Sequence, residues 1–248
     1  MSAAGPPLLW TEGLTRSFGG ITAVKDCSLE VRTGSITGLI GPNGSGKTTL
    51  FNLITGIYAA DGGEVYLRDR RITGLTPSRI CHLGLSRTFQ ITRLFWDLSV
   101  LENMIVPVRQ VGLRALLGPG MYRHEQERAL ILLGRVGLTH LKEQPAGKLS
   151  FGQQKLLEFA SVLMSEPDVV LLDEPTGGVN PTIIRFMMDL IRALNGEGVT
   201  FLVVEHNMTV VMELCDHIIV MNHGQKIAAG PPPVVQQDPV VLDAYLGV

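Results

Sequence analysis

The 248-residue chain has little of what marks a secreted or membrane-embedded protein. It contains only three cysteines, Cys27, Cys81 and Cys215. Because they are odd in number and widely separated, they argue against a disulfide framework and show no metal-ligand spacing. We expect all three to be buried free thiols. The longest apolar runs, such as residues 169–172, are far shorter than the roughly 20 residues of a membrane-spanning helix, so we expect no such helix.

Charge is also sparse. Asp, Glu, Lys and Arg make up 18% of the chain, and the formal net charge is -2. A nucleic-acid-binding protein normally carries a basic footprint, so we expect no nucleic-acid partner. So few charges are typical of a surface partly covered by other proteins. The first ten residues, MSAAGPPLLW, lack a basic start followed by an apolar stretch, so we expect no secretory signal and a cytosolic chain.

Apolar residues, by contrast, make up 45% of the chain, enough for a sizeable core. Continuous apolar runs alternate with helical stretches, a pattern that favours an α/β fold with a mostly parallel sheet covered on both faces. These runs are SITGLI (35–40), VVLLD (169–173), VTFLVV (199–204) and HIIVM (217–221). Further strands are expected at 8–18, 24–31, 64–72 and 83–90.

Between about residues 91 and 165 the pattern changes to apolar residues at helical spacing. Helices are expected within 99–110, 123–137 and 152–164, with a surface loop at 112–122. We interpret the chain, residues 1–248, as one domain. Its core comprises residues 8–90 and 166–248, and residues 91–165 form an inserted helical subdomain.

The stretch GPNGSGKTT fits the P-loop pattern G-x-x-x-x-G-K-[ST] and lies between a strand and a helix. Its glycines allow backbone N–H groups to face phosphate oxygens, and the helix N-terminus adds partial positive charge. Lys47 would reach the β- and γ-phosphates, and Thr48 would ligate magnesium. The predicted nucleotide-binding residues are Gly41, Pro42, Asn43, Gly44, Ser45, Gly46, Lys47, Thr48 and Thr49.

Two acids follow the strand VVLLD. Asp173 ends it, where a P-loop protein holds magnesium through water. Glu174 comes next, and a carboxylate there can orient and polarise the water that attacks the γ-phosphate. A helix-capping or surface acid is the alternative for Glu174, and its pairing with Asp173 and the P-loop favours catalysis.

Two more polar residues end strands. Gln90 leads into the helical insert and could touch magnesium or the attacking water, although an ordinary exposed amide is the alternative. His206 directly follows FLVVE, where its side chain can point at a γ-phosphate. We expect the other five histidines to be surface or packing residues: His82, His124, His140, His217 and His223.

LSFGQQK, starting at Leu149, predicts a second anion site. Ser150 could cap the following helix, and Gly152 with the helix amides could bind an oxyanion. The P-loop already wraps the phosphates of its own nucleotide, so a second site is useful if it closes over the nucleotide of another subunit. An ordinary serine-capped helix is the alternative.

Taken in order, GPNGSGKTT, Gln90, LSFGQ, VVLLDEP and His206 resemble the nucleotide-binding domain of an ABC ATPase, over essentially the whole chain. The resemblance implies a P-loop NTPase (RecA-like) α/β core, an N-terminal antiparallel β subdomain and an inserted helical subdomain. It also implies ATP and Mg²⁺ as ligands. Two such domains pack head to tail in this family, so that each ATP lies between the P-loop of one and the signature of the other.

The same resemblance assigns roles to single residues. Glu174 becomes the general base, His206 the γ-phosphate switch and Gln90 the lever toward a transmembrane partner, with Lys47 completing the catalytic set. Phe18 matches the aromatic residue that stacks on adenine. Thr48, Gln90 and Asp173 match the magnesium site, and Ser150, Phe151, Gly152 and Gln153 match the signature that contacts the partner's ATP.

Two positions depart from the family pattern. Phe151 stands where the signature usually has glycine, so the first turn cannot use glycine's conformational freedom there. Asn180, in TGGVNP, replaces the usual aspartate, which removes a charge at the dimer interface. This change puts in doubt how tightly the two active sites communicate.

The subfamily is indicated by LSFGQQK, GVNP, VVEHNM, GLSRTFQITRLFWDLSVLENM and the closing DPVVLDAYLG, which resemble ATP-binding subunits of branched-chain amino-acid importers. Urea or amide importers and lipopolysaccharide exporters share much of this pattern and remain alternatives. A soluble ABC ATPase of DNA repair or translation would need two fused domains or a long coiled coil. A small-molecule kinase would leave LSFGQQK and His206 without a role.

The resemblance also implies partners: a second ATPase subunit (a copy or a paralogue), two transmembrane permeases and, indirectly, a solute-binding protein. The chain would then lie at the cytoplasmic face of the membrane. Residues 90–101 are the expected permease-facing groove, because Phe95 and Trp96 are apolar residues that water would not favour. Burial of these two rings in the helical insert is the alternative.

Overall fold

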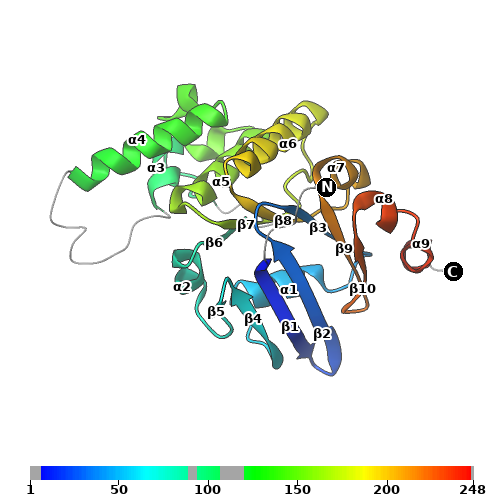
Figure 1. Cartoon of the computed structure of the whole chain (residues 1–248). Helices are drawn as coiled ribbons and strands as arrows, with labels where there is room; N and C mark the ends of the chain where they lie inside the picture. Colours follow the sequence, from blue (N-terminus) through cyan, green and yellow to red (C-terminus); the bar gives the residue numbers. More distant parts are fainter. Residues whose placement is uncertain (1–6, 89–93, 107–119, 247–248) are drawn as a thin grey trace.

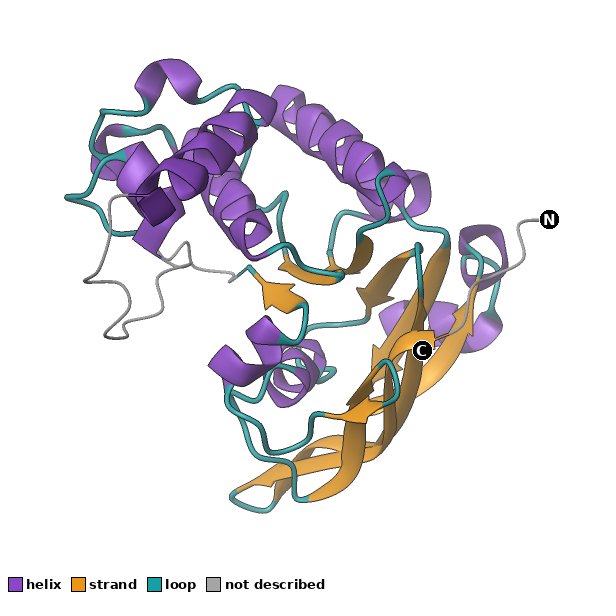
Figure 2. Cartoon of the chain, turned by 60° about the vertical axis from the view of Figure 1, so that its left-hand side comes forward, coloured by secondary structure: helices purple, strands orange, loops and turns teal. Residues whose placement is uncertain are grey.

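The computed structural model describes residues 7–88, 94–106 and 120–246. Its strands form two sheets (Figures 1 and 2). The antiparallel sheet has the order β2-β1-β4-β5, with β1 Pro7–Phe18, β2 Ile21–Arg32, β4 Gly62–Leu67 and β5 Arg70–Arg71. The second sheet has the order β10-β9-β3-β8-β7-β6, with β3 Ile36–Ile40, β6 Leu85–Arg87, β7 Val169–Asp173, β8 Thr200–Val204, β9 His217–Asn222 and β10 Gln225–Gly230. Within it only β10 pairs antiparallel, with β9.

Helices cover both faces of the second sheet, as its apolar strands predict (Figure 1). On one face α1 Lys47–Ile54 packs between the two sheets, with the short α2 Pro77–His82 nearby. The other face carries α3 Val100–Ile105, α4 Gly120–Arg135, α5 Phe151–Val162, α6 Pro181–Gly196 and α7 Met208–Leu214. The chain ends in α8 Pro232–Val235 and α9 Pro239–Leu246 beside β10. Among the described residues no helix is long and apolar enough to span a bilayer.

Alternation along the central strands divides the core into two layers. Leu171 of β7 faces the layer that contains α1, whereas Leu172 faces the layer that contains α5 and α6. Both side chains are fully buried. Each such leucine contributes about 1.5–3 kcal/mol by leaving water, so a strand that is apolar on both faces stabilises both layers.

Three expectations need correction. The strand expected at 64–72 is two strands, because Arg68 has φ 53° and the chain turns back so that Leu67 pairs with Arg70. The end of the loop expected at 112–122 is helical, because α4 begins at Gly120; residues 112–119 lie outside the described residues. Cys81 is only partly buried.

Cys27 and Cys215 are buried as expected, and all three cysteines are free thiols. Burial raises the pKa of Cys27 to about 11 and that of Cys215 to about 12. Since the thiolate is the reactive form, these two thiols are chemically inert near neutral pH.

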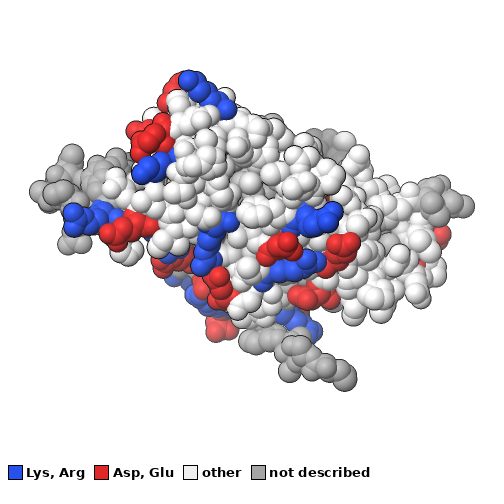
Figure 3. Space-filling model, turned by 90° about the horizontal axis from the view of Figure 1, so that it is seen from above, with Lys and Arg blue, Asp and Glu red and all other residues white. Residues whose placement is uncertain are grey.

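Seen from the helical side, the described surface is mostly uncharged, with acidic and basic side chains mixed in small groups (Figure 3). No broad basic area is visible among the described residues on this face, in keeping with the low charge content of the chain.

Candidate nucleotide-binding and hydrolysis site

The glycine loop joins the end of β3 to the start of α1 and requires glycine at two positions. Gly41 has φ 150°, and a Cβ there would lie 2.1 Å from the carbonyl oxygen of Met221. Gly46 has φ 102°, and a Cβ there would lie 2.4 Å from the carbonyl oxygen of Ala23. The back of the loop is therefore packed against β2 and β9, so its other side faces the expected position of the phosphates.

Lys47 lies under this loop and is 6% exposed. Its Nζ donates hydrogen bonds to the carbonyl oxygens of Gly41 and Pro42, both at 2.9 Å. Burial lowers the pKa of Lys47, while the carboxylates of Glu174 and Asp173 act to raise it. The ammonium group therefore lies between the loop and the two acids. Phosphate oxygens would replace the two carbonyl oxygens as its hydrogen-bond acceptors.

Asp173 ends β7, is 1% exposed, and is held by a partner that the sequence reasoning missed. Arg87, at the end of β6, pairs with it at 2.7 Å between Nη2 and Oδ2. Arg87 also donates to Asn52 Oδ1 of α1 at 2.6 Å. The other carboxylate oxygen, Asp173 Oδ1, is buried without a hydrogen-bond partner among the described residues. Arg87 lies within the strand expected at 83–90, but the sequence pattern does not indicate that this strand pairs with β7.

Glu174 and His206 meet across neighbouring strand ends. His206 Nε2 lies 2.7 Å from Glu174 Oε1, and the two side chains are partly exposed. Glu174 has φ 49°, an uncommon conformation for a residue with a side chain, and its N–H donates to the carbonyl of Val204 at 2.9 Å. The turn after β7 therefore aims the carboxylate back toward the end of β8, where His206 follows.

Glu205 is a second residue that the sequence reasoning passed over. It is 4% exposed, and its Oε1 accepts hydrogen bonds from the N–H and hydroxyl of Thr176 at 2.8 and 2.6 Å. Its Oε2 accepts from the N–H of His206 at 3.2 Å. Glu205 thus fixes the segment after Glu174 to the segment that carries His206.

Tertiary structure brings most of the predicted phosphate-site residues together. β3, β8 and β7 are neighbours in the sheet, so the glycine loop, His206 and the Asp173–Glu174 pair all follow the carboxyl ends of adjacent parallel strands (Figure 1). Thr48 is exposed at the first turn of α1, and Thr49 follows it. Gln90 lies outside the described residues.

Comparisons with known proteins agree with this geometry. The ABC transporter family model matches residues 24–177. The chain belongs to the ABC transporter family. A second model, described as "Branched-chain amino acid ATP-binding cassette transporter", matches residues 225–248. The chain is therefore an ATP-binding and ATP-hydrolysing transporter subunit.

Individual relatives match along nearly the whole length. The "High-affinity branched-chain amino acid transport ATP-binding protein LivG" of Salmonella typhimurium is 41% identical over 97% of this chain and 98% of its own. The similarly named BraF of Pseudomonas aeruginosa is 40% identical over the same shares. The crystal structure of a nucleotide-free ATP-binding cassette from an ABC transporter has a TM-score of 0.87 at 36% identity, covering 98% of this chain and 100% of that one.

In this ABC ATPase the signature segment begins α5 with a capping box. Ser150 Oγ accepts from the N–H of Gln153, and Gln153 Oε1 accepts from the N–H of Ser150 at 2.9 Å. The serine-capped helix is therefore present, and Ser150 is exposed. A Cβ on Gly152 would lie 3.2 Å from Ile183 of α6, so the small residue permits close packing of two helices.

Phe151 does not need glycine's freedom, because it is the first helical residue of α5. Phe151 is 49% exposed, and its ring covers Gly178 in the turn before α6. A Cβ on Gly178 (φ 73°) would lie 3.1 Å from Phe151 Cε1. The ring thus connects the signature to the segment that follows Glu174.

Asn180 caps α6, its Oδ1 accepting from the N–H of Ile183 at 3.0 Å. Aspartate caps helices equally well, so the replacement removes a charge and keeps the cap.

Three aromatic residues predicted to bind partners or ligands lie at the surface. Phe18 ends β1, is 39% exposed and packs edge-to-face on Tyr58 with ring centroids 5.3 Å apart. Arg16 lies 4.8 Å from the Phe18 ring centroid. Phe95 and Trp96 are 52% and 47% exposed, so the alternative that they are buried in the helical insert is wrong.

Proposed function

We propose that the chain is the ATPase subunit of an importer of branched-chain amino acids, in which ATP binding and hydrolysis between two subunits move a membrane permease. The observation that carries the proposal is the meeting of Lys47, Asp173, Glu174 and His206 at adjacent strand ends. The cargo class rests on the names of the relatives and on the model that matches residues 225–248. A urea, amide or lipopolysaccharide system is the alternative.

The residues present fit a magnesium ion. Asp173 Oδ1 is buried and lacks a partner among the described residues, and Thr48 is exposed in the first turn of α1, directly after the glycine loop. We infer that Thr48, Gln90 and, through water, Asp173 hold Mg²⁺. When bound, the ion would neutralise charge on the β- and γ-phosphates.

The phosphate oxygens of ATP would bind the N–H groups of residues 41–49 and the Lys47 ammonium, while adenine stacks on the exposed face of Phe18. Glu174 accepts a proton from a water molecule whose oxygen attacks the γ-phosphorus, and the bond from that phosphorus to the leaving ADP oxygen breaks. In the structure, the His206 ring donates a hydrogen bond to the Glu174 carboxylate. We infer that an arriving γ-phosphate draws His206 away from Glu174 and leaves the carboxylate to the attacking water.

A second subunit would complete the site. Ser150 and Phe151 are exposed at the N-terminus of α5, where Gly152 and the helix amides offer donors to the γ-phosphate of a partner's ATP while Gln153 holds the Ser150 backbone. ATP then favours a head-to-tail closed dimer, because only that state contacts the phosphates from both sides. The second subunit is a copy or a paralogue of this chain.

Closure would turn residues 91–165 as a helical subdomain against a core of 8–90 and 166–248. We infer that the exposed rings of Phe95 and Trp96, with Gln90 nearby in sequence, engage two transmembrane permeases at the cytoplasmic face of the membrane. A solute-binding protein would deliver the cargo from the far side.

Glu174→Gln tests the catalytic assignment. We expect ATP hydrolysis to fall at least about 100-fold, because the amide accepts no proton, while ATP binding is retained and an ATP-bound dimer accumulates. Steady-state phosphate release and size-exclusion chromatography with ATP measure both effects. Glu143→Gln, at an exposed acid, is the matched control. Hydrolysis at the wild-type rate by Glu174→Gln would overturn the catalytic assignment. A reconstituted transporter that takes up no leucine in the presence of ATP would overturn the proposed cargo class.

A further inference from the structure

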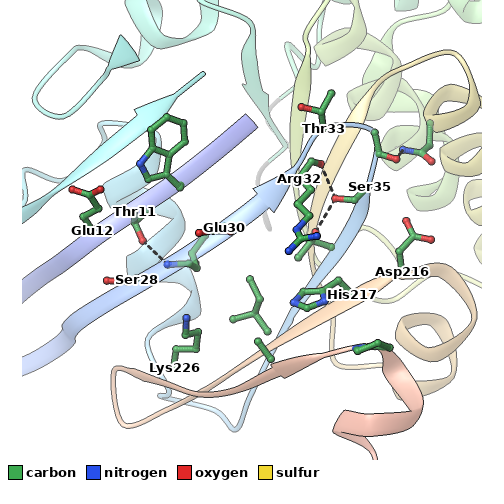
Figure 4. A pocket seen from close by; sticks show the side chains of 18 residues that line it. Thr11, Glu12, Ser28, Glu30, Arg32, Thr33, Ser35, Asp216, His217 and Lys226 are labelled. Carbon is green, nitrogen blue, oxygen red and sulfur yellow. Dashed lines mark hydrogen bonds between the residues drawn. The ribbon is translucent and has the colours of Figure 1, made fainter. Parts of the chain in front are cut away.

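A cavity of about 880 Å³ lies away from the nucleotide site (Figure 4). Strands β1 and β2 form one wall, and β9 with β10 forms the other. None of the P-loop or signature residues lines it. Small-molecule sites in proteins typically have volumes of about 300–1,000 Å³, so the cavity is large enough for a metabolite.

Three basic side chains line this cavity from three strands. They are Arg32 at the end of β2, His217 at the start of β9 and Lys226 on β10. Burial lowers the pKa of His217, and the charges of Arg32 and Lys226 lower it further. Within the described part of the chain, none of these three side chains forms an ion pair with a carboxylate. Figure 4 shows Arg32 and His217 on one side of the cavity and Lys226 on the other side, below Glu30, so the guanidinium of Arg32 with the His217 ring creates the position that favours an anion.

The cavity also has an acidic side. Glu12 and Glu30 line it from β1 and β2, and Figure 4 shows them on the side away from His217. A third acid, Asp216, is already engaged, since its Oδ2 accepts from the N–H of Ile36 at 2.8 Å. A polyphosphate would meet repulsion from Glu12 and Glu30, whereas a molecule with one negative and one positive group would satisfy both sides.

Apolar residues also line the cavity. Trp10, Ala229 and Pro231 line it, and each is at least partly exposed, whereas the lining residues Leu29 and Ile219 are buried in the core. These groups would cover an aliphatic substituent of a few carbon atoms and remove it from water.

We propose that this cavity binds a free α-amino acid with an apolar side chain, its carboxylate held by Arg32 and His217 and its ammonium group facing Glu30. The site is separate from ATP hydrolysis and extends the proposed function, because its ligand belongs to the same chemical class as the proposed cargo. One structural path connects it to the P-loop: the turn after β9, where the N–H of Gly224 donates to the carbonyl of Ser45 at 3.0 Å.

Calorimetric titration of the full chain with L-leucine, without nucleotide or permease, tests the proposal. We expect saturable binding by the wild type and a loss of at least about tenfold in affinity in Arg32→Gln and in Glu30→Gln, since each removes one charge partner. Arg70→Gln, at an exposed arginine of β5, is the matched control and should bind like the wild type. Thermal unfolding curves confirm that all variants are folded.

Ligand variants separate the sources of affinity. Isovalerate lacks the ammonium group, isoamylamine lacks the carboxylate and glycine lacks the side chain, so each should bind at least about tenfold more weakly than leucine. Absence of leucine binding overturns the proposal, as does unchanged affinity in Arg32→Gln. Inorganic phosphate binding as tightly as leucine would overturn the zwitterion assignment. Because ATP is absent, each result is independent of the Glu174→Gln test.

The protonation of His217 gives a second readout. The charged groups around it are Arg32 from β2, Lys226 from β10, Glu12 and Glu30 from the opposite wall, and Asp216 beside it. A bound carboxylate would raise the pKa of His217, so binding takes up a proton and leucine affinity should increase as pH falls. NMR of the imidazole with and without leucine measures this shift, and an unchanged imidazole titration contradicts the placement of the carboxylate.

Discussion

At the scale of single residues, the candidate site combines partly exposed polar groups with a buried ion pair. Glu174 and His206 are partly exposed, whereas Asp173 and Arg87 are almost completely buried. A buried ion pair contributes little net stability, but loss of one partner leaves a charge without compensation in a medium of low polarity.

Arg87→Ala should therefore lower the free energy of unfolding by about 3–5 kcal/mol, because the Asp173 carboxylate would remain buried and unpaired. Urea denaturation measures the change. The matched control is Arg135→Ala, since the Arg135–Glu197 pair is exposed and its loss should cost less than about 1 kcal/mol. Equal effects of the two substitutions would contradict the special role of the buried pair.

The three thiols provide a residue-scale test with a pH dependence. In the native protein at pH 8, Cys81 should react with iodoacetamide, while Cys27 and Cys215 should react only after unfolding, as mass spectrometry can determine. Because folding raises the pKa of Cys27 from 9.0 to about 11, the neutral thiol is favoured in the folded state. The contribution of Cys27 to the free energy of unfolding is fully present below pH 9 and decreases as the pH rises toward about 11. Native labelling of Cys27 at the rate of Cys81 would contradict this burial.

At the scale of elements, Phe151 connects the start of α5 to the turn before α6. Ser150 caps one of these helices and Asn180 caps the other, so the two helix starts form a single packed unit. We infer that this unit transmits movement between the signature and Glu174.

Gly178→Ala tests the contact. Alanine at φ 73° costs about 1 kcal/mol, and the new methyl group would also push against the Phe151 ring. Gly137→Ala is a matched control, because Gly137 has the same φ and a Cβ there would meet no other residue within 4 Å. Gly178→Ala should be the more destabilising and should slow ATP hydrolysis. When Phe151→Ala is also present, Gly178→Ala should be no more destabilising than Gly137→Ala. Equal destabilisation by the two glycine substitutions in the otherwise wild-type protein would rule out the contact.

At the scale of the whole molecule, the central sheet links both layers of the core. Leu171 and Leu172 are adjacent on β7 yet belong to opposite layers. Loss of packing on one face of the sheet should therefore also destabilise the layer on the other face.

Leu171→Ala and Leu172→Ala should each lower stability by about 2–5 kcal/mol and should both shift the same single unfolding transition. Circular dichroism and intrinsic fluorescence during urea denaturation check this, because the two signals should coincide. A conservative Leu171→Met variant should cost less than about 1.5 kcal/mol. Separate transitions after Leu172→Ala would show that the helical layer unfolds independently.

Local patterns in the sequence were enough to predict much of the fold and most of the candidate site. Apolar runs predict the strands of the parallel sheet, and GPNGSGKTT predicts the loop between β3 and α1, because strand burial and glycine conformation are local properties. The adjacency of Asp173 and Glu174 also follows from their sequence positions. Turn geometry is less visible in the pattern, which is why β4 and β5 were expected as one strand.

Only the tertiary structure decided which distant residues meet. The Arg87–Asp173 pair, the contact of Phe151 with Gly178 and the convergence of Arg32 with His217 depend on strand order and helix packing. Side-chain periodicity reports which face of an element is buried, but it carries no information about the neighbour across that face. The sequence by itself therefore determined the glycine loop and the polar residues at the strand ends, and folding determined their buried partners, the exposed rings of Phe95 and Trp96 and the second cavity.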